Sequence, residues 1–290
     1  MLKALVRLPL YICKRWGLHL FMTGVFILLL LLVHRQVFAY FANESRYQVD
    51  LTNFSAANLP EWLTDEDLKQ SVTDSLQCSI QTHLFDDNLI PRLVAYYTSC
   101  PWVERVELIE KRLPNNLKIK LELRRPYVVV QQEESLLLRY YLVDKDGTRL
   151  PGEYERIPDL PLTLPVVVGV KSKPPLAGER WTDDGLTNAI AVTGILEEHK
   201  LKSSPLLGKI DVSNIHGRKN LKESEIVIWT QTNIPIQWGR APDTDKFGEL
   251  SVAEKINNLK LVLEVCPELK GLKYVKIQFN QPYIALQEAP

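Results

Sequence analysis

The most constraining feature of the sequence is a short stretch in which apolar and charged side chains alternate. The alternating residues are Leu117, Lys118, Ile119, Lys120, Leu121, Glu122, Leu123 and Arg124. A period of two is typical of a β-strand that has one face buried and the other in water. The chain therefore has to place this stretch in a sheet that is covered on one side.

A β-hairpin is predicted, because a second apolar run precedes the alternating stretch. Residues 103–111 are rich in Val, Leu and Ile, and the sequence Leu-Pro-Asn-Asn follows at 113–116. Proline presets φ for the first central position of a turn, and Asn tolerates a tight corner. Pro126 is expected to end the second strand, because proline has no N–H to give to a ladder.

An apolar run near the N-terminus predicts a membrane helix. Residues 17–33 are apolar except for His19 and Thr23. As a helix they span about 26 Å, slightly less than the ~30 Å core of a bilayer, and the flank up to residue 41 can lengthen them. The chain before the run is basic and has no acidic residue. This bias predicts a cytoplasmic tail at 1–16, a membrane helix with its flank at 17–41, and an extracytoplasmic remainder.

A cleaved signal peptide is the alternative to a retained membrane helix. Val37-Phe38-Ala39 has the small-residue pattern of a cleavage site. His34 and Arg35 follow the apolar run directly and favour retention.

A strand and two helices are predicted between the membrane and the hairpin. Residues 47–51 alternate like a short strand. Thr64 is expected to cap the first helix, with Asp67 as its capping-box partner. The second helix is expected to begin within residues 87–91 and to end at about Ser99. Strand, helix, helix and hairpin together have the size and order of a single POTRA domain, at 46–126.

Beyond Pro126 the pattern changes to short strands that two helices interrupt. Strands are predicted at 128–130, 136–143, 166–170, 209–212, 225–230, 234–238 and 274–279. One helix follows Thr182 and runs to about His199. The other begins at Ser251, has Glu254 as its capping-box partner, and ends before Pro267. The predicted fold class is α+β, with residues 127–290 as a C-terminal β-rich domain.

Several short motifs occur in an order that is known from one protein family. They are Pro101-Trp102-Val103 with Leu113-Pro114, Leu142-Val143-Asp144-Lys145-Asp146-Gly147, Leu164-Pro165-Val166 with Gly169, residues 233–240, and the strand at 274–279. Together they resemble FtsQ, also called DivIB, a bacterial cell-division family with a membrane helix, a POTRA domain and a β domain. The chain departs from the family pattern at Trp238, Lys276, Gln278 and Gln281-Pro282.

The resemblance implies a non-enzymatic scaffold that links early and late division proteins at the cytoplasmic (inner) membrane. The implied partners are FtsB-like and FtsL-like membrane proteins, with no catalytic residue, metal, cofactor, nucleic acid or small-molecule substrate. We expect partner-binding residues at Tyr274, Ile277, Phe279 and Tyr283, because such side chains anchor interfaces and the final strand is expected to be an edge strand that accepts another. Val275, Ile277 and Phe279 share one face, so their burial in the sheet is the alternative.

Two other functions remain open. One is a different membrane-tethered POTRA protein that serves export or envelope assembly. The other is a type II membrane glycosyltransferase, because Asp144 and Asp146 match an Asp-x-Asp motif that holds a divalent metal. Gly147 follows at once and favours a hairpin turn, in which Asn would serve equally well at both positions.

Charge, histidines and cysteines add few indications of chemistry. The 35 basic and 35 acidic residues balance, which gives no indication of nucleic-acid binding. The five histidines form no pair at ligand spacing, so a zinc site is not expected. Cys78 and Cys100 could form a disulfide, although free cysteines usually act as small buried side chains.

The basic bias before residue 17 predicts the orientation in the membrane. In spheroplasts, a membrane-impermeant thiol reagent should fail to label Cys13, and an external protease should cleave beyond residue 46. Labelling of Cys13 from outside would contradict the predicted orientation.

Overall fold

The computed structural model describes residues 7–50, 60–75, 81–134, 137–202, 206–242 and 248–287. The chain divides into two compact units. The first comprises Met1–Phe54, Leu76–Val94 and Leu108–Ile119, and the second comprises Ser55–Ser75, Ala95–Glu107 and Lys120–Pro290. The predicted domains at 46–126 and 127–290 stay a prediction. Leu51 of the predicted first strand and Cys78 lie outside the described residues.

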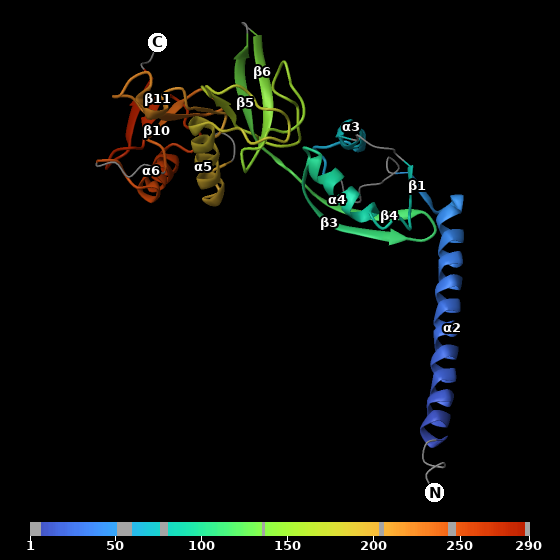
Figure 1. The fold of residues 1–290 in the computed structure, drawn as a ribbon. Helices are drawn as coiled ribbons and strands as arrows, with labels where there is room; N and C mark the ends of the chain where they lie inside the picture. Colours follow the sequence, from blue (N-terminus) through green and yellow to red (C-terminus); the bar gives the residue numbers. More distant parts are fainter. Residues whose placement is uncertain are drawn as a thin grey trace. The chain divides into compact units, whose positions relative to one another are not determined.

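The N-terminal helix α2 runs from Arg7 to Asn43 and is the long helix at the blue end of Figure 1. Its segment His19–Phe41 has 23 residues, is exposed except for the half-buried Phe41, and is long and apolar enough to cross a membrane. The hydroxyl of Thr23 donates a hydrogen bond of 2.8 Å to the carbonyl of His19. This bond satisfies the polar group within the apolar segment. The predicted helix at 17–41 is confirmed, and it extends in both directions.

An aromatic cluster joins the end of α2 to the first strand within the first unit. The short 3-10 helix η1 (Ser45–Tyr47) leads into β1 (Gln48–Asp50), which pairs antiparallel with β2 (Gln81–His83). The Tyr47 ring lies 5.7 Å from that of Phe41 and 5.1 Å from that of Phe85. Burial of these rings fixes the chain where it leaves the helix.

The predicted helices and hairpin between residues 64 and 126 are present. Helix α3 spans Asp65–Ser75 and α4 spans Leu89–Ser99. Thr64 Oγ1 accepts the Asp67 N–H at 3.1 Å, and its hydroxyl donates to the Asp67 carboxylate at 2.5 Å. The strands β3 (Val103–Arg112) and β4 (Asn116–Leu123) form a two-stranded sheet. The apolar face of β4 is half-buried, whereas the sequence predicted a buried one.

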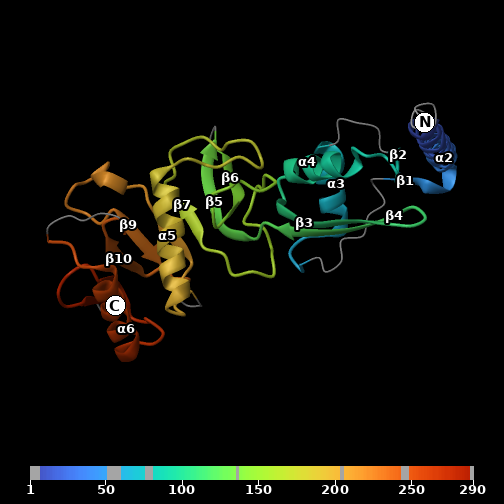
Figure 2. The same cartoon turned by 60° about the horizontal axis from the view of Figure 1, so that its bottom comes forward.

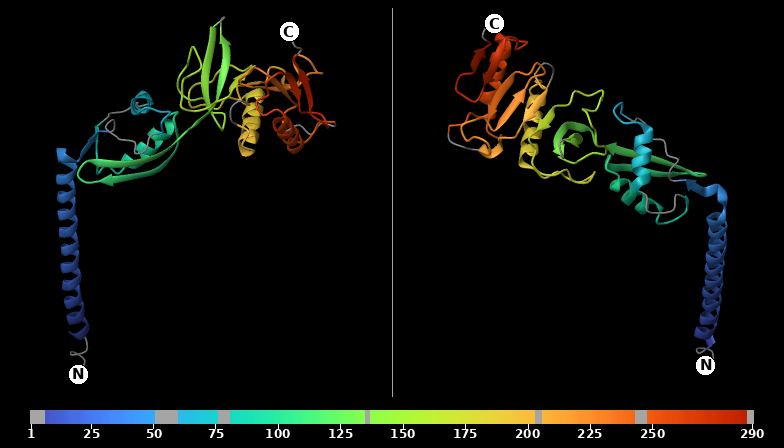
Figure 3. Two further views of the ribbon diagram at one scale, coloured as in Figure 1. Left: turned by 180° about the vertical axis from the view of Figure 1, so that it is seen from behind. Right: turned by 90° about the horizontal axis from the view of Figure 1, so that it is seen from above.

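The strand-rich part of the second unit is a single eight-stranded sheet in the order β12-β11-β10-β9-β8-β7-β5-β6. Its strands are β5 (Pro126–Glu134), β6 (Leu137–Asp144), β7 (Val166–Val168), β8 (Lys209–Asp211), β9 (Ile226–Trp229), β10 (Pro235–Gly239), β11 (Leu272–Lys276) and β12 (Tyr283–Leu286). The pairs β5·β7, β7·β8 and β10·β11 are parallel, and the others are antiparallel. Figure 3 shows this part of the chain from two further sides, coloured from green at β5 and β6 to red near the C-terminus. The predicted α+β class is confirmed.

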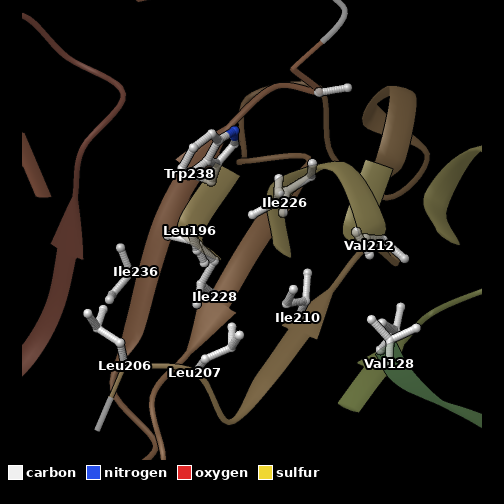
Figure 4. Close-up of a cluster of buried hydrophobic side chains, with 14 of the residues drawn as sticks. Val128, Leu196, Leu206, Leu207, Ile210, Val212, Ile226, Ile228, Ile236 and Trp238 are labelled. Atoms are coloured by element: carbon white, nitrogen blue, oxygen red, sulfur yellow. The ribbon is translucent and has the colours of Figure 1, made fainter. Parts of the chain in front are cut away.

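Helices α5 (Asp184–Glu198) and α6 (Val252–Val265) cover one face of this sheet (Figure 2). Alternate strand residues such as Ile210, Ile228 and Ile236 point into one core with Leu196 of α5 and Leu259 of α6. Figure 4 shows the part of this core around Leu196 and Trp238. The period-two pattern of the strands and the apolar stripes of the helices therefore meet in one layer.

Side-chain caps start both helices. The capping box of Ser251 and Glu254 forms as predicted. Helix α5 is capped by Asp183, whose Oδ1 accepts the Leu186 N–H at 3.1 Å. The other oxygen accepts the N–H groups of Lys171 at 3.2 Å and Ser172 at 3.1 Å. Asp183 thus holds both the helix start and the loop that follows β7.

These bonds make the Asp183 cap dependent on pH. Burial alone raises the pKa of its carboxyl, but the N–H donors of Ser172, Leu186 and Lys171 outweigh burial and hold the pKa below its usual range. A lowered pKa stabilises the fold above the unfolded-state pKa of about 3.9. That stabilisation is lost as the pH falls through the folded-state pKa.

We expect Asp183→Asn to lower the free energy of unfolding by about 1–3 kcal/mol at pH 7, because Asn keeps one acceptor oxygen and its NH2 group cannot accept the remaining N–H groups. The difference from the natural chain should shrink as the pH falls below about 4, the usual pKa of Asp. Urea unfolding of the purified protein between pH 3 and 7 measures both effects. The control Asp159→Asn changes an exposed side chain. A difference that is constant over this pH range would contradict the prediction.

Candidate partner-binding edge

The two ends of the eight-stranded sheet differ in how their backbone is covered. The outer side of β6 forms bridges from Tyr140 to Tyr154 and from Val143 to Arg149. A following segment of the chain thus covers part of that edge. At the other end, β12 pairs with β11 only, as far as the described residues extend. An unpaired strand edge presents N–H and C=O groups that can accept an added strand.

The strand at this edge is not the one that the sequence predicted. Residues 274–279 were expected at the edge, but β11 has β10 on one side and β12 on the other. The expected edge position of 274–279 is therefore wrong, because residues 283–286 form a further strand outside it. The sequence does contain a signal for this edge strand. Pro282 stands directly before the run Tyr-Ile-Ala-Leu, and proline is tolerated at the start of an edge strand.

Three of the four predicted partner-binding residues reach the surface. Phe279 is 52% exposed and Tyr283 is 54% exposed, while Tyr274 is half-buried. Ile277 is fully buried, and its N–H donates to the Gln237 carbonyl at 3.2 Å. We therefore describe the candidate surface by Tyr274, Phe279 and Tyr283.

A pair of tyrosines and a lysine form the face of this edge that points away from the core. Val275 and Ile277 are buried, so the alternate residues Tyr274 and Lys276 point to the opposite face. Tyr283 lies opposite Lys276, and its ring stacks on that of Tyr274 with 5.9 Å between the centroids. The Lys276 ammonium lies 5.3 Å from the Tyr274 centroid, within range of a cation–π contact. The result is an ordered aromatic surface with one positive charge.

Asn258 fixes the segment that presents Phe279. This side chain of α6 is buried, and its amide donates to the carbonyls of Ile277 at 3.0 Å and Phe279 at 2.8 Å. Both carbonyls are thereby satisfied without a neighbouring strand. The sequence analysis did not identify Asn258. Its position directly before Leu259 of the apolar stripe of α6 is a signal that this polar side chain bonds backbone groups near the core.

The backbone of β12 shows which groups face outward. The Gln287 N–H points toward the β11 side and donates to the Gly271 carbonyl at 2.9 Å. Because backbone groups of successive strand residues point to opposite sides, the N–H and C=O of Leu286 point away from β11. Its side chain is 70% exposed. As far as the described residues extend, an incoming strand would find one unpaired donor and one unpaired acceptor at this residue.

The rival Asp-x-Asp motif forms a turn. Asp144 Oδ1 accepts the N–H groups of Asp146 at 2.9 Å and Thr148 at 2.7 Å. Its Oδ2 accepts from Arg124 Nη1 at 2.8 Å, and Gly147 has φ +81°. The predicted turn is confirmed. The expectation that Asn would serve at both positions stays a prediction. At Asp144 such a change would also remove a buried charge that forms an ion pair with Arg124.

Cys100 is a free, buried thiol in the structure, and its Sγ lies 3.5 Å from the Ser71 hydroxyl oxygen. Burial raises the pKa of this thiol, which keeps it protonated and unreactive. This agrees with a role as a small buried side chain.

Neither a scan against protein-family models nor a search of curated proteins finds a match to this chain. The candidate surface is therefore interpreted from its own geometry.

We expect Asp144→Asn to lower the free energy of unfolding by about 1–3 kcal/mol, because it leaves the partly buried Arg124 guanidinium without its counter-charge. The matched change Asp146→Asn should alter it by less than about 0.5 kcal/mol, since Asp146 is exposed. Urea unfolding measures both. Equal effects of the two changes would contradict the role assigned to Asp144.

Proposed function

We propose that this chain is a single-pass membrane scaffold of bacterial cell division, of the FtsQ/DivIB type. The N-terminus lies in the cytoplasm, and the POTRA domain and β domain lie outside the membrane. The observation that supports this proposal best is the open edge strand β12 beside exposed aromatic residues. A scaffold needs a surface that other proteins can extend, and an open edge is such a surface.

The partner is an extended segment of an FtsB-like protein, which is itself associated with an FtsL-like protein. Backbone hydrogen bonds to β12 supply affinity that does not depend on sequence. The stacked pair of Tyr274 and Tyr283 supplies specificity, because rigid aromatic side chains are frequent interface anchors. Lys276 favours a partner segment that carries a carboxylate at the facing position.

The membrane helix contributes to this function by restricting where the edge can move. The segment His19–Phe41 is long enough to hold the protein in the bilayer. Partners that are anchored in the same membrane meet the edge at a raised effective concentration. A modest affinity at β12 is then sufficient for assembly.

We expect two changes at this edge to weaken partner binding. Leu286→Pro removes the outward N–H and leaves the β11 ladder intact, and Tyr283→Glu places a charge in the aromatic surface. Each should weaken recovery of the FtsB-like partner from dividing cells by at least the equivalent of about 2 kcal/mol, roughly 30-fold in affinity. Matched controls are Leu221→Pro and Leu176→Glu at exposed sites elsewhere in the second unit.

The test separates the proposal from its alternatives. Unchanged partner recovery with both edge variants, each with an unchanged urea midpoint, would remove β12 from the partner site. Recovery of export or envelope-assembly proteins instead of division proteins would favour the other membrane-tethered POTRA function.

A further inference from the structure

A second candidate surface lies in the same compact unit, in a cavity of about 1860 Å³. One wall is the start of α3 with the turn before it, and the other is the loop at residues 151–161. The side chains that define it include Trp62, Asp67, Trp102, Leu142, Tyr154 and Ile157. None of these residues belongs to the β12 edge.

The loop wall is held in place by the sheet. Tyr154 and Tyr140 exchange two backbone hydrogen bonds, at 2.9 and 3.0 Å. Gly152 has φ +102°, and a Cβ there would lie 2.5 Å from the Tyr154 hydroxyl oxygen. Only glycine fits this bend. The wall is therefore held by β6, and its bend depends on Gly152.

Two tryptophans form the apolar part of the other wall. The rings of Trp62 and Trp102 lie 5.7 Å apart with an interplanar angle of 36°. Trp102 is buried, and its carbonyl accepts the Arg124 N–H at 2.8 Å. Trp62 is half-buried, so part of its surface is available to a ligand. A tryptophan face is the best aromatic acceptor for a cation.

The charge of the cavity lining is strongly negative. Its carboxylates are those of Glu61, Asp67, Glu153, Glu155 and Asp159, and its single cation is Arg156. Outside the lining, Arg139 forms ion pairs with Glu153 at 3.2 Å and Glu155 at 3.0 Å. Within the described residues of the lining, at least two carboxylates thus remain without a counter-charge, in a chain whose overall charge is zero.

Two of these carboxylates belong to different walls of the cavity. Within the part of the chain that the structure describes, Glu61 and Asp159 form no hydrogen bond and no ion pair, and both are exposed. Asp67 also acts across the cavity. Burial first, and then the Asp67 carboxylate, raise the pKa of the Tyr154 hydroxyl.

We propose that this cavity is a groove that binds an extended, arginine- or lysine-rich segment of a partner protein. Its basic side chains would meet the unpaired carboxylates and the Trp62 face, and its apolar residues would contact Ile157, which is 52% exposed. The volume exceeds the roughly 300–1,000 Å³ of a small-molecule site, which favours a longer ligand. Prolines at 151, 158 and 161 have no N–H, so recognition rests on side chains instead of strand addition.

This site goes beyond the proposed function, because it lies on a different surface from the β12 edge. It would also select a basic partner segment, whereas the edge favours an acidic one. The edge offers Lys276 and unpaired backbone, whereas the groove offers carboxylates and tryptophan. One chain could therefore hold two partner segments at once.

The test uses the full chain in detergent micelles and a fluorescein-labelled peptide of five Arg-Leu repeats. Fluorescence anisotropy should show saturable binding that weakens as salt rises, because exposed charges are screened. The same peptide with Glu in place of Arg should not bind. The double variant Glu61→Gln, Asp159→Asn should weaken binding by about three- to tenfold, as expected for two exposed ion pairs.

The matched control Glu198→Gln, Glu264→Gln removes two exposed carboxylates elsewhere and keeps the same net charge. It should bind the peptide as the natural chain does, and so should Leu286→Pro. Equal weakening by the control and the groove variant would show non-specific attraction and overturn the proposal. Binding of the neutral glycan chitotetraose with no binding of the Arg-Leu peptide would overturn it in favour of a carbohydrate site.

Discussion

Burial of one face of the eight-stranded sheet under α5 and α6 is the constraint on which the second unit depends. Ile210, Ile228 and Ile236 are fully buried in the same cluster as Leu196 and Leu259. Each such side chain contributes about 1.5–3 kcal/mol when it leaves water. Because this one layer holds the strands in register, the opposite face and the two edges of the sheet are free to differ. The candidate functional surfaces of the protein lie there.

The core also contains a buried charged side chain, which is stabilised by an ion pair and an aromatic ring. Lys255 of α6 is 2% exposed and forms an ion pair with Glu249. Its ammonium lies 5.4 Å from the ring centroid of Trp238. Glu249 in turn accepts the Arg240 N–H at 3.0 Å, which ties the chain after β10 to the helix. Trp238, a departure from the FtsQ-like pattern, is thus used as the apolar neighbour of this ion pair.

The two edges of the sheet are treated in different ways, and both proposed surfaces follow from that difference. At β6, Arg149 and Tyr154 bridge the outer strand, and the loop at 151–161 continues from there as the groove wall. At β12, the backbone of Leu286 remains open within the described residues, and Lys276 and Tyr283 lie opposite each other at the other end of the same strand pair. The covered edge provides the wall of the groove that we propose to select by charge. The open edge provides the backbone groups that we propose to accept an added strand.

The sequence by itself determined the local elements of this protein. The apolar helix, the hairpin, the Asp144 turn and the caps at Thr64 and Ser251 depend on residues only a few positions apart, so they can be read from spacing. Only the tertiary structure decided that β12 is the edge, that Asn258 holds the segment before it, and that Ile277 is buried. Each of these depends on contacts between segments far apart in the chain. These segments come together because the strands bury one sheet face in common. No local sequence pattern shows which strands share that face.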